Sequence, residues 1–300
     1  MSRELILRPS AKINLTLRVG PVRPDGFHEV RTLMQSVALS DRMTFSSRRG
    51  PFVVASSSPG VPTDRTNLIY VAAERLWRAM GRTGEPRDVH VRLVKEIPVA
   101  AGLGGGSADA AAALVGLNAL WQARLSRRDL VRLGGEIGSD VPFALHGGTA
   151  LGAGRGEELY PVDDAPKVPI VIVKPSFGIS TAQAYAWLDA DRGQGTASAA
   201  PDVSARAGEM DLGWPGGPVA LVNDLQAPVA VRHPAIGEIV EALRRAGARA
   251  AAMTGSGSAV FGVFSGPVPR TALRGLQRPD WLVILTRTSD RRETARRLAL

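Results

Sequence analysis

Residues 98–109 carry the strongest signal in the chain: Pro98-Val99-Ala100-Ala101-Gly102-Leu103-Gly104-Gly105-Gly106-Ser107-Ala108-Asp109. Glycines interrupt the backbone, and the alanine-rich run that begins after Ser107 is a strong helix former. A glycine loop at a helix N-terminus presents free N–H groups and the positive end of the helix dipole to an anion. Glycine also lets a bulky anion approach the main chain. The segment therefore predicts a nucleotide-phosphate site near residues 102–108.

The loop matches neither common phosphate fingerprint. A P-loop ends in Gly-Lys-Ser/Thr, whereas this loop contains no lysine. A dinucleotide fingerprint needs an acidic residue about 20 positions further on, after a second strand, but here the helical pattern continues through Leu117, Leu120 and Trp121. Taken alone, the loop is equally compatible with a flexible turn capped by Ser107.

Length and composition indicate a globular protein with a sizeable core. The 300 residues are 44% hydrophobic and 22% charged, which suits one large domain or two ordinary ones. The chain has no cysteine, which excludes disulfides and thiolate metal sites and favours a cytoplasmic location. No apolar stretch approaches the roughly 20 residues of a membrane span, and the first residues lack a signal-peptide pattern. We expect no membrane association.

The net charge of +9 raises the possibility of a basic RNA-binding protein. However, most of the positive charge is arginine, its most evident clusters are at Arg127-Arg128 and near the C-terminus, and aromatic residues are only 5% of the chain. We therefore expect a solvated surface with a mild attraction for anionic substrates, and no nucleic acid. Arginine cannot replace a lysine that must act as a compact charge beside a reacting group, which gives weight to the few lysines. These are Lys12, Lys95, Lys167 and Lys174.

Hydrophobic patterns predict a mixture of strands and helices. Before residue 160 we expect strands at 4–8, 13–19, 30–39, 42–46 and 89–94, and a strand after the turn at 147–152. A helix is expected at 67–80, with Leu68, Val71, Ala72, Leu76 and Met80 on one face, and another at 129–133 with Ser126 as N-cap.

The pattern resets at 162–166. Beyond it we expect strands at 168–175, 259–264 and 281–285, helices at 181–188 and 236–245, a second glycine loop at 253–257, and a long, mobile connection at 191–218. Strands and helices do not alternate strictly, so the predicted fold class is α+β, in two lobes divided near residue 160.

Four segments in this order strengthen the interpretation. They are Pro-Ser-Ala-Lys-Ile-Asn-Leu at 9–15, the glycine loop at 98–109, Ile-Gly-Ser-Asp-Val-Pro-Phe at 137–143, and Met-Thr-Gly-Ser-Gly-Ser at 253–258. Together they resemble the GHMP kinase superfamily. The resemblance implies an ATP-binding N-terminal domain over 1–160 and an α/β-plait-like C-terminal domain over 161–300. ATP would be the co-substrate, with Mg²⁺ carried by the nucleotide, and the protein would be a monomer or weak homodimer.

Finer details of these segments indicate which substrate of the superfamily this protein would use. The Ala-Lys-Ile-Asn-Leu opening, the segment Gly26-Phe27-His28-Glu29 and the Gly-Leu-Gly-Gly-Gly-Ser loop resemble the superfamily members that phosphorylate the 2-hydroxyl of 4-diphosphocytidyl-2-C-methylerythritol, in non-mevalonate isoprenoid biosynthesis. The alternative within the superfamily is a mevalonate- or homoserine-type kinase acting on a different small alcohol.

The resemblance assigns catalysis to Asp140 and Lys12. Asp140 would take the hydroxyl proton, and Lys12 beside it would favour the ionised carboxylate and offset charge near the transferred phosphoryl group. Alternation along the strand puts Lys12 and Asn14 on one face, where Asn14 would bond the substrate or Asp140. The competing interpretations are an aspartate that caps its own Gly-Ser-Asp turn and a lysine on the protein surface.

The substrate-binding residues implied by the resemblance lie in both lobes. Phe27 would stack on the cytosine, although the family usually has tyrosine there, and His28 would bond the base edge. Thr181 and Tyr185 fall at i and i+4, so they would share a helix face in the cytidine pocket. The alternatives are that Phe27 packs on the sheet of its hairpin, that His28 is exposed to solvent, and that Thr181 and Tyr185 only pack their helix.

The nucleotide would lie along residues 98–108. The Ser107 hydroxyl would bind Mg²⁺ or a phosphate oxygen, while Ala108 stands where the family often has a second serine. Asp109, in the first turn, would suit the helix dipole. Asn67, Leu68 and Lys95 are expected near adenine, and Gly255-Ser256-Gly257 would reach the cleft from the second lobe. No metal held by protein ligands alone is expected.

Overall fold

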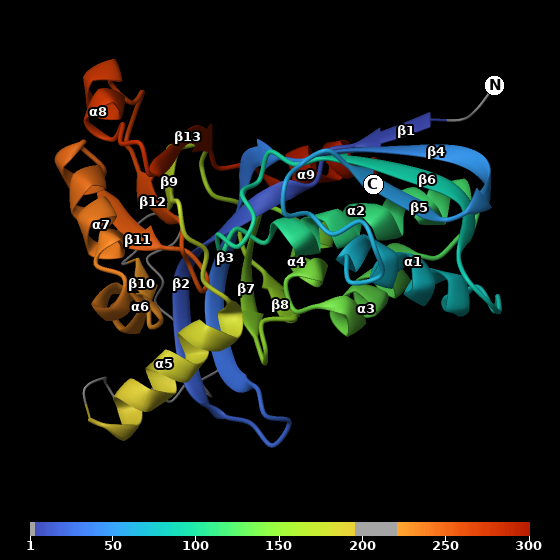
Figure 1. The fold of residues 1–300 in the computed structure, drawn as a ribbon, viewed down its shortest axis with the longest axis horizontal. Coiled ribbons are helices and arrows are strands. Elements are labelled where there is room, and N and C mark those ends of the chain that lie inside the picture. The colour runs from blue at the N-terminus through green and yellow to red at the C-terminus, as the bar shows by residue number, and fades with distance from the viewer. Residues whose placement is uncertain (1–3, 196–220) are drawn as a thin grey trace.

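The computed structural model describes residues 4–195 and 221–300, whose strands form three sheets (Figure 1). The expected connection at 191–218 begins inside helix α5 (Thr181–Gly193), and its part at 196–218 lies outside the described residues. In the described part of the chain, no helix is both long enough and apolar enough to cross a bilayer.

The first sheet builds the main core of the N-terminal part. Its order is β1 (Glu4–Leu7), β4 (Arg42–Pro51), β6 (Arg87–Val94) and β5 (Val53–Ser56). Along β6 the apolar side chains of Val89, Val91 and Leu93 are buried, as the alternating sequence predicts. They pack in one apolar cluster with residues of three helices, which are α1 (Leu68–Ala79), α2 (Gly105–Leu120) and α3 (Arg127–Ile137).

The second sheet is centred on a long hairpin. Its order is β10 (Val222–Asn223), β2 (Ser10–Val22), β3 (His28–Ser40), β7 (Thr149–Ala153) and β8 (Glu158–Pro161). The register of β2 against β3 shifts between Asn14 and Thr16, and such a bulge re-aims the side chains beside it. This places the polar pair predicted on β2 next to an irregular point of the ladder.

The third sheet forms the C-terminal part. Its order is β11 (Ala250–Met253), β12 (Val260–Val263), β9 (Pro169–Pro175) and β13 (Trp281–Arg287). Figure 1 shows α5, α6 (Gln226–Arg232), α7 (Ala235–Arg245) and α8 (Arg270–Gly275) grouped at this end of the molecule. Another apolar cluster joins the two parts, with residues of β2 and β3 packed on residues of β9 and β12.

The chain returns to its N-terminal part at the end. Helix α9 (Arg291–Leu298) contacts α4 (Val141–His146), and the Arg8 N–H donates to the carbonyl oxygen of Arg297 over 2.9 Å. Leu298 is buried in the cluster beneath the first sheet. The division of the domains at residue 160 stays a prediction, since α9 packs against elements from before that point.

Most expected elements are present, with one instructive difference in helix α1. Helix α3 has the predicted cap, in which Ser126 and Asp129 form a reciprocal capping box. Helix α1, however, buries Ile69, Ala73 and Trp77 in addition to the predicted Ala72 and Leu76, while Leu68, Val71 and Met80 are only partly buried. The buried stripe is displaced because the Trp77 ring packs edge-on against Trp121, with ring centroids 5.0 Å apart.

Candidate active site

The predicted site residues meet around one cavity of about 990 Å³, between the β2–β3 hairpin, the glycine loop, α4 and α5. Ala108 is the exception: it is buried and does not line the cavity. Gly257, at the edge of the second glycine loop, does not line it either. The predicted residues that do line it are Lys12, Asn14, Phe27, His28, Asn67, Leu68, Lys95, residues 98–107, Asp140, Thr181, Tyr185, Gly255 and Ser256.

The glycine loop is clamped so closely that only glycine fits. Gly102 and Gly104 both have left-handed backbones, with φ of +74° and +69°. A Cβ on Gly102 would lie 2.1 Å from the main-chain oxygen of Thr254, and one on Gly104 would lie 2.9 Å from Cγ of Lys12. The loop therefore sits between β2 and the second glycine loop, with its backbone facing the cavity.

Helix α2 begins at Gly105 rather than after Ser107. Gly104 is its N-cap and makes no side-chain cap, so the predicted cap by Ser107 is wrong. The left-handed Gly104 starts the helix three residues early, which puts Ser107 in its first turn. The first N–H groups of an α-helix have no partner within the helix, and here Gly105, Gly106 and Ser107 line the cavity. This end of α2 fits an anion.

Lys12 and Asp140 form an ion pair on the cavity wall. Nζ of Lys12 lies 3.3 Å from Oδ2 of Asp140, with side chains 8% and 33% exposed. Asp140 is the N-cap residue of α4, yet its carboxylate makes no cap hydrogen bond. The interpretations of a self-capping aspartate and a surface lysine are therefore wrong. The carboxylate remains available to a group in the cavity, beside a buried ammonium.

The Asn14 side chain forms a hydrogen bond with Lys12 and not with Asp140. The Lys12 ammonium donates to Oδ1 of Asn14 over 2.6 Å, and the Asn14 amide donates to the Thr32 hydroxyl over 2.7 Å. The Thr254 hydroxyl accepts from the Asn14 N–H over 3.0 Å. The expected hydrogen bond from Asn14 to Asp140 is absent because the shared strand face places the Lys12 ammonium beside Asn14. Thr254, which the sequence showed only as part of a glycine loop, fixes this arrangement.

A buried charge cluster lies next to the glycine loop, and its Lys95 and Asp109 line the cavity. Nζ of Lys95 lies 2.8 Å from Oδ2 of Asp109 and also bonds Asp41. Asp41 accepts the N–H groups of Glu96 and Ile97, whereas Oδ1 of Asp109 is buried with no hydrogen-bond partner. Burial raises the pKa of Asp109 to about 8, with the neighbouring charge of Asp41 acting in the same direction. We therefore assign the neutral carboxyl group to Asp109.

This cluster corrects one expectation and leaves another as a prediction. Asp109 lies beyond the first turn of α2, so the predicted interaction of its carboxylate with the helix dipole is wrong. The Lys95 ammonium is bonded to two carboxylates, so its expected position near adenine stays a prediction. Asn67 likewise uses its amide locally: Oδ1 caps α1 through the Ile69 N–H, and Nδ2 donates to the Pro62 carbonyl. A nucleotide contact by Asn67 also stays a prediction.

Aromatic side chains line the other end of the cavity. Phe27 is 54% exposed, with the Arg155 guanidinium 5.0 Å from its ring centroid. The His28 ring lies 5.1 Å from that of Tyr185, and its Nε2 is 3.2 Å from Oδ2 of Asp189. Burial lowers the pKa of His28, so a neutral ring donates from only one nitrogen. Asp189 is a neighbour that the sequence did not reveal.

The N-terminus of α5 faces the second glycine loop. Thr181 and Tyr185 share a helix face as expected, and the Thr181 hydroxyl lies 3.2 Å from that of Ser256. Burial raises the pKa of Tyr185, and the negative charge of Asp140 acts in the same direction. Residues from both parts of the chain thus converge on the Lys12–Asp140 pair.

Known proteins match this chain along most of its length. The family models "GHMP kinases N terminal domain" and "GHMP kinases C terminal" match residues 67–148 and 204–279. A 4-diphosphocytidyl-2-C-methyl-D-erythritol kinase of Moorella thermoacetica is 46% identical, over 95% of this chain and 99% of its own. One of Anaeromyxobacter dehalogenans is 47% identical, over 90% and 83%.

Solved structures agree with the family models. The crystal structure of a 4-(cytidine 5'-diphospho)-2C-methyl-D-erythritol kinase superposes with a TM-score of 0.73 at 33% identity, covering 96% of this chain and 99% of the other. The Methanococcus jannaschii mevalonate kinase superposes with a TM-score of 0.68 at 11% identity, covering 96% and 99%, which shows a common fold. The chain belongs to the GHMP kinases, in the family of 4-diphosphocytidyl-2-C-methyl-D-erythritol kinases.

Proposed function

We propose that this kinase transfers the terminal phosphoryl group of ATP to the 2-hydroxyl of 4-diphosphocytidyl-2-C-methyl-D-erythritol, giving the 2-phosphate and ADP. The names of relatives at 46% and 47% identity support this substrate. The observation that carries the chemistry is the Lys12–Asp140 pair, 3.3 Å apart, on the same cavity as the glycine loop. The reaction would be a step in non-mevalonate isoprenoid precursor biosynthesis.

In the proposed mechanism, Asp140 and Lys12 have different tasks. As the substrate oxygen forms its bond to the γ-phosphorus, the bond from that phosphorus to the β,γ-bridging oxygen breaks, and ADP leaves. The hydroxyl proton passes to the Asp140 carboxylate. The Lys12 ammonium, held by Asn14, stabilises negative charge on the phosphoryl group in transit. Holding both groups in place before the substrate binds reduces the reorganisation that the reaction requires.

The phosphate site fits the exposed end of α2. We assign the triphosphate to the N–H groups of residues 105–107 and to the close backbone approach that Gly102 and Gly104 permit. Among residues 4–195 and 221–300, no three His, Asp or Glu side chains converge as a metal site. We propose that Mg²⁺ arrives with ATP and that the Ser107 hydroxyl contributes to its binding. When bound, the ion neutralises phosphate charge.

The cytosine is assigned to the aromatic end of the cavity. Phe27 is half-exposed, and the rings of His28 and Tyr185, 5.1 Å apart, line the same cavity. A base edge at His28 would compete with Asp189 for Nε2, because this nitrogen already lies 3.2 Å from that carboxylate. Asp189 is half-exposed and can rotate away. We assign Thr181 to the substrate side of the same cavity.

The test compares substrates in one assay. Release of ADP by the purified protein is coupled to a reporter reaction, with the cytidylated methylerythritol, mevalonate or homoserine as acceptor. We expect turnover with the cytidylated alcohol and at least a hundredfold lower kcat/KM with the other two. A preference for mevalonate or homoserine would favour a different small-alcohol kinase and would contradict the cytosine assignment.

Three broader proposals accompany this function. We propose a cytoplasmic location, which the absence of cysteine supports. We propose a monomer or weak homodimer, to be measured by sedimentation. We also propose a division into domains at 1–160 and 161–300, which the positions of the two family models on either side of residue 160 support.

A further inference from the structure

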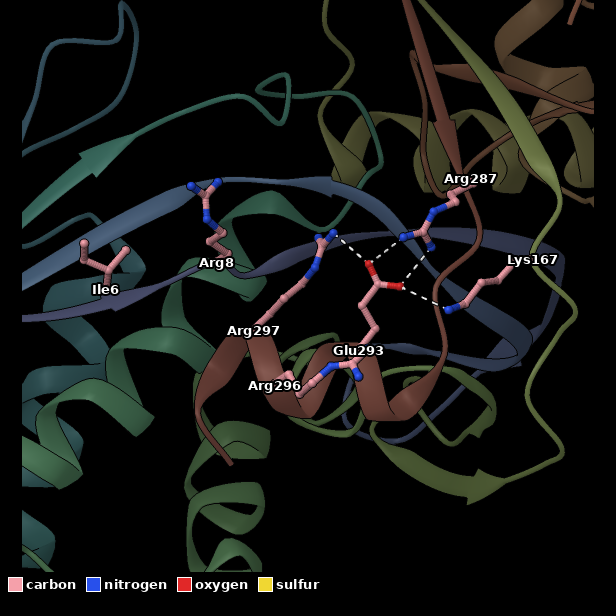
Figure 2. A pocket seen from close by; sticks show the side chains of 7 residues that line it. All are labelled: Ile6, Arg8, Lys167, Arg287, Glu293, Arg296 and Arg297. Atoms are coloured by element: carbon pink, nitrogen blue, oxygen red, sulfur yellow. Dashed lines mark hydrogen bonds and ion pairs between the residues drawn. The ribbon is translucent and has the colours of Figure 1, made fainter. Parts of the chain in front are cut away.

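A second cavity, of about 430 Å³, shares no lining residue with the candidate active site. Figure 2 shows that Arg287, Lys167 and Arg297 meet at Glu293 of α9, whereas Ile6 and Arg8 lie along the first strand and Arg296 lies on α9. The chain thus brings together residues up to 291 positions apart in the sequence. The lining residues are Ile6, Arg8, Lys167, Arg287, Glu293, Arg296 and Arg297, and we call this cavity the basic pocket.

The basic pocket holds more positive charge than its carboxylates can balance. Five of its lining residues are cationic, and Glu293 is its only acidic one. Glu293 accepts two hydrogen bonds from Arg287, both 2.9 Å long, and one of 2.8 Å from Arg297. Lys167 pairs with Asp290, outside the pocket, at 3.1 Å. Counting both acids, at least three positive charges are left over, in a concave site that concentrates their field.

Two of the cations are uncommitted. Within the described residues, the side chains of Arg8 and Arg296 make no hydrogen bond or ion pair, and both residues are exposed. Burial lowers the pKa of Arg297, and the charges of Arg287 and Arg8 act in the same direction, while Glu293 opposes them. Arginines that merely face solvent would spread apart, whereas here they gather around one hollow.

We propose that the basic pocket binds the diphosphate group of a small molecule. Guanidinium groups match phosphate oxygens in a planar, two-pronged geometry, and the two free arginines supply such forks. The volume suits a small ligand, and Ile6, 46% exposed, offers an apolar contact to the part that carries the diphosphate. A nucleic acid needs a row of phosphate contacts along a surface, whereas these side chains line one shallow hollow.

The position of the basic pocket gives its occupant a structural consequence. Arg8 follows β1 in the N-terminal part, whereas Lys167 and Arg287 belong to the C-terminal part, beside β9 and at the end of β13. An anion bound between them would link the two parts that form the active-site cavity. Binding at the basic pocket is therefore expected not to require the reacting groups. It can still restrain how far the two parts of the protein move apart.

The test uses equilibrium dialysis of the full-length protein with radiolabelled inorganic diphosphate. The Arg8→Ala/Arg296→Ala double variant removes both uncommitted cations without breaking a hydrogen bond or ion pair of the described structure. The matched control is Arg48→Ala/Arg49→Ala, which removes the same charge from exposed arginines outside both cavities. Kinase turnover without added diphosphate and the melting temperature should be the same in all three proteins.

We expect the wild-type protein to bind more diphosphate per chain than the Arg8→Ala/Arg296→Ala variant at concentrations near the Kd of the basic pocket. The affinity at this site should fall at least about tenfold when the two charges are removed. The control should bind as the wild type does. Equal binding by all three proteins would overturn the proposal, as would equal losses in the two double variants. A short RNA that binds the basic pocket more than tenfold tighter than diphosphate would overturn the assignment to a small molecule.

Discussion

Replacing Asp109 by asparagine should stabilise the protein at neutral pH, although it removes one partner of a buried ion pair. Asp109 lies 2.8 Å from the Lys95 ammonium, but Asp41 also bonds that ammonium and accepts two backbone N–H groups. One cation thus meets two carboxylates, and one of them must carry a proton to balance the charge. Asparagine has nearly the shape of the protonated acid and needs no such proton.

The magnitude follows from the pKa of Asp109. Its folded-state pKa of about 8 lies above the ordinary value of 3.8, so the folded protein binds more protons than the unfolded chain between these values. Stability is therefore greatest below pH 3.8 as far as this group is concerned, and it falls as pH rises towards 8. At pH 7 the free energy of unfolding is therefore lower than its value below pH 3.8 by at most about 4 kcal/mol because of this group. Asparagine removes this dependence, so the advantage of the variant should grow from pH 5 to pH 8.

Urea denaturation of the wild type and of Asp109→Asn at pH 5, 6, 7 and 8 measures this effect. Asp280→Asn is the control, because Asp280 is exposed and its substitution should stay within about 0.5 kcal/mol. If Asp109 were instead ionised and paired with Lys95, the substitution would destabilise the protein by about 3 kcal/mol or more. A loss of that size at pH 7, with no dependence on pH, would refute the assignment of the proton to Asp109.

Three further substitutions probe the active-site cavity. In steady-state kinetics, Phe27→Ala should raise the KM for the cytidylated substrate far more than the KM for ATP. Phe27→Tyr keeps the ring and should leave both KM values near those of the wild type. Equal effects of Phe27→Ala on both KM values would contradict the stacking assignment. Gly102→Ala should lower the melting temperature and abolish nucleotide binding, because its Cβ would lie 2.1 Å from the Thr254 oxygen; an unchanged Kd for ATP in calorimetry would show that the loop can shift. Thr254→Val should lower kcat about tenfold, because it removes a hydrogen bond that orients Asn14. Thr254→Ser should restore the rate. A kcat of the valine variant equal to that of the wild type would exclude this role.

The sequence predicted the parts of the site that lie within short motifs. Alternation along β2 put Lys12 and Asn14 on one face, and they form a hydrogen bond 2.6 Å long. The family resemblance brought Asp140 next to Lys12, which no local pattern could do. The glycine-rich loop was recognised from composition alone, because glycine is required where the backbone is left-handed and closely approached.

Contacts between distant segments escaped the sequence. Thr254 lies 240 residues from Asn14, and Asp41 lies 54 residues from Lys95, so no spacing rule connects them. The start of α2 was misplaced because Gly104 adopts a left-handed conformation that begins the helix early, which changed the interpretation of Asp109. The C-terminal arginines were expected to be a solvated face, because the distant Arg8 and Lys167 that complete the basic pocket give no local signal.

Turnover of Asp140→Asn, measured together with its substrate affinities, tests the proposed chemistry most directly. Asparagine keeps the shape of the side chain but cannot accept the hydroxyl proton. We expect kcat to fall by about 10²- to 10⁴-fold, while calorimetry gives Kd values for the cytidylated alcohol and a non-hydrolysable ATP analogue within about threefold of the wild type. A kcat within threefold of the wild type would show that the carboxylate beside Lys12 does not take the proton.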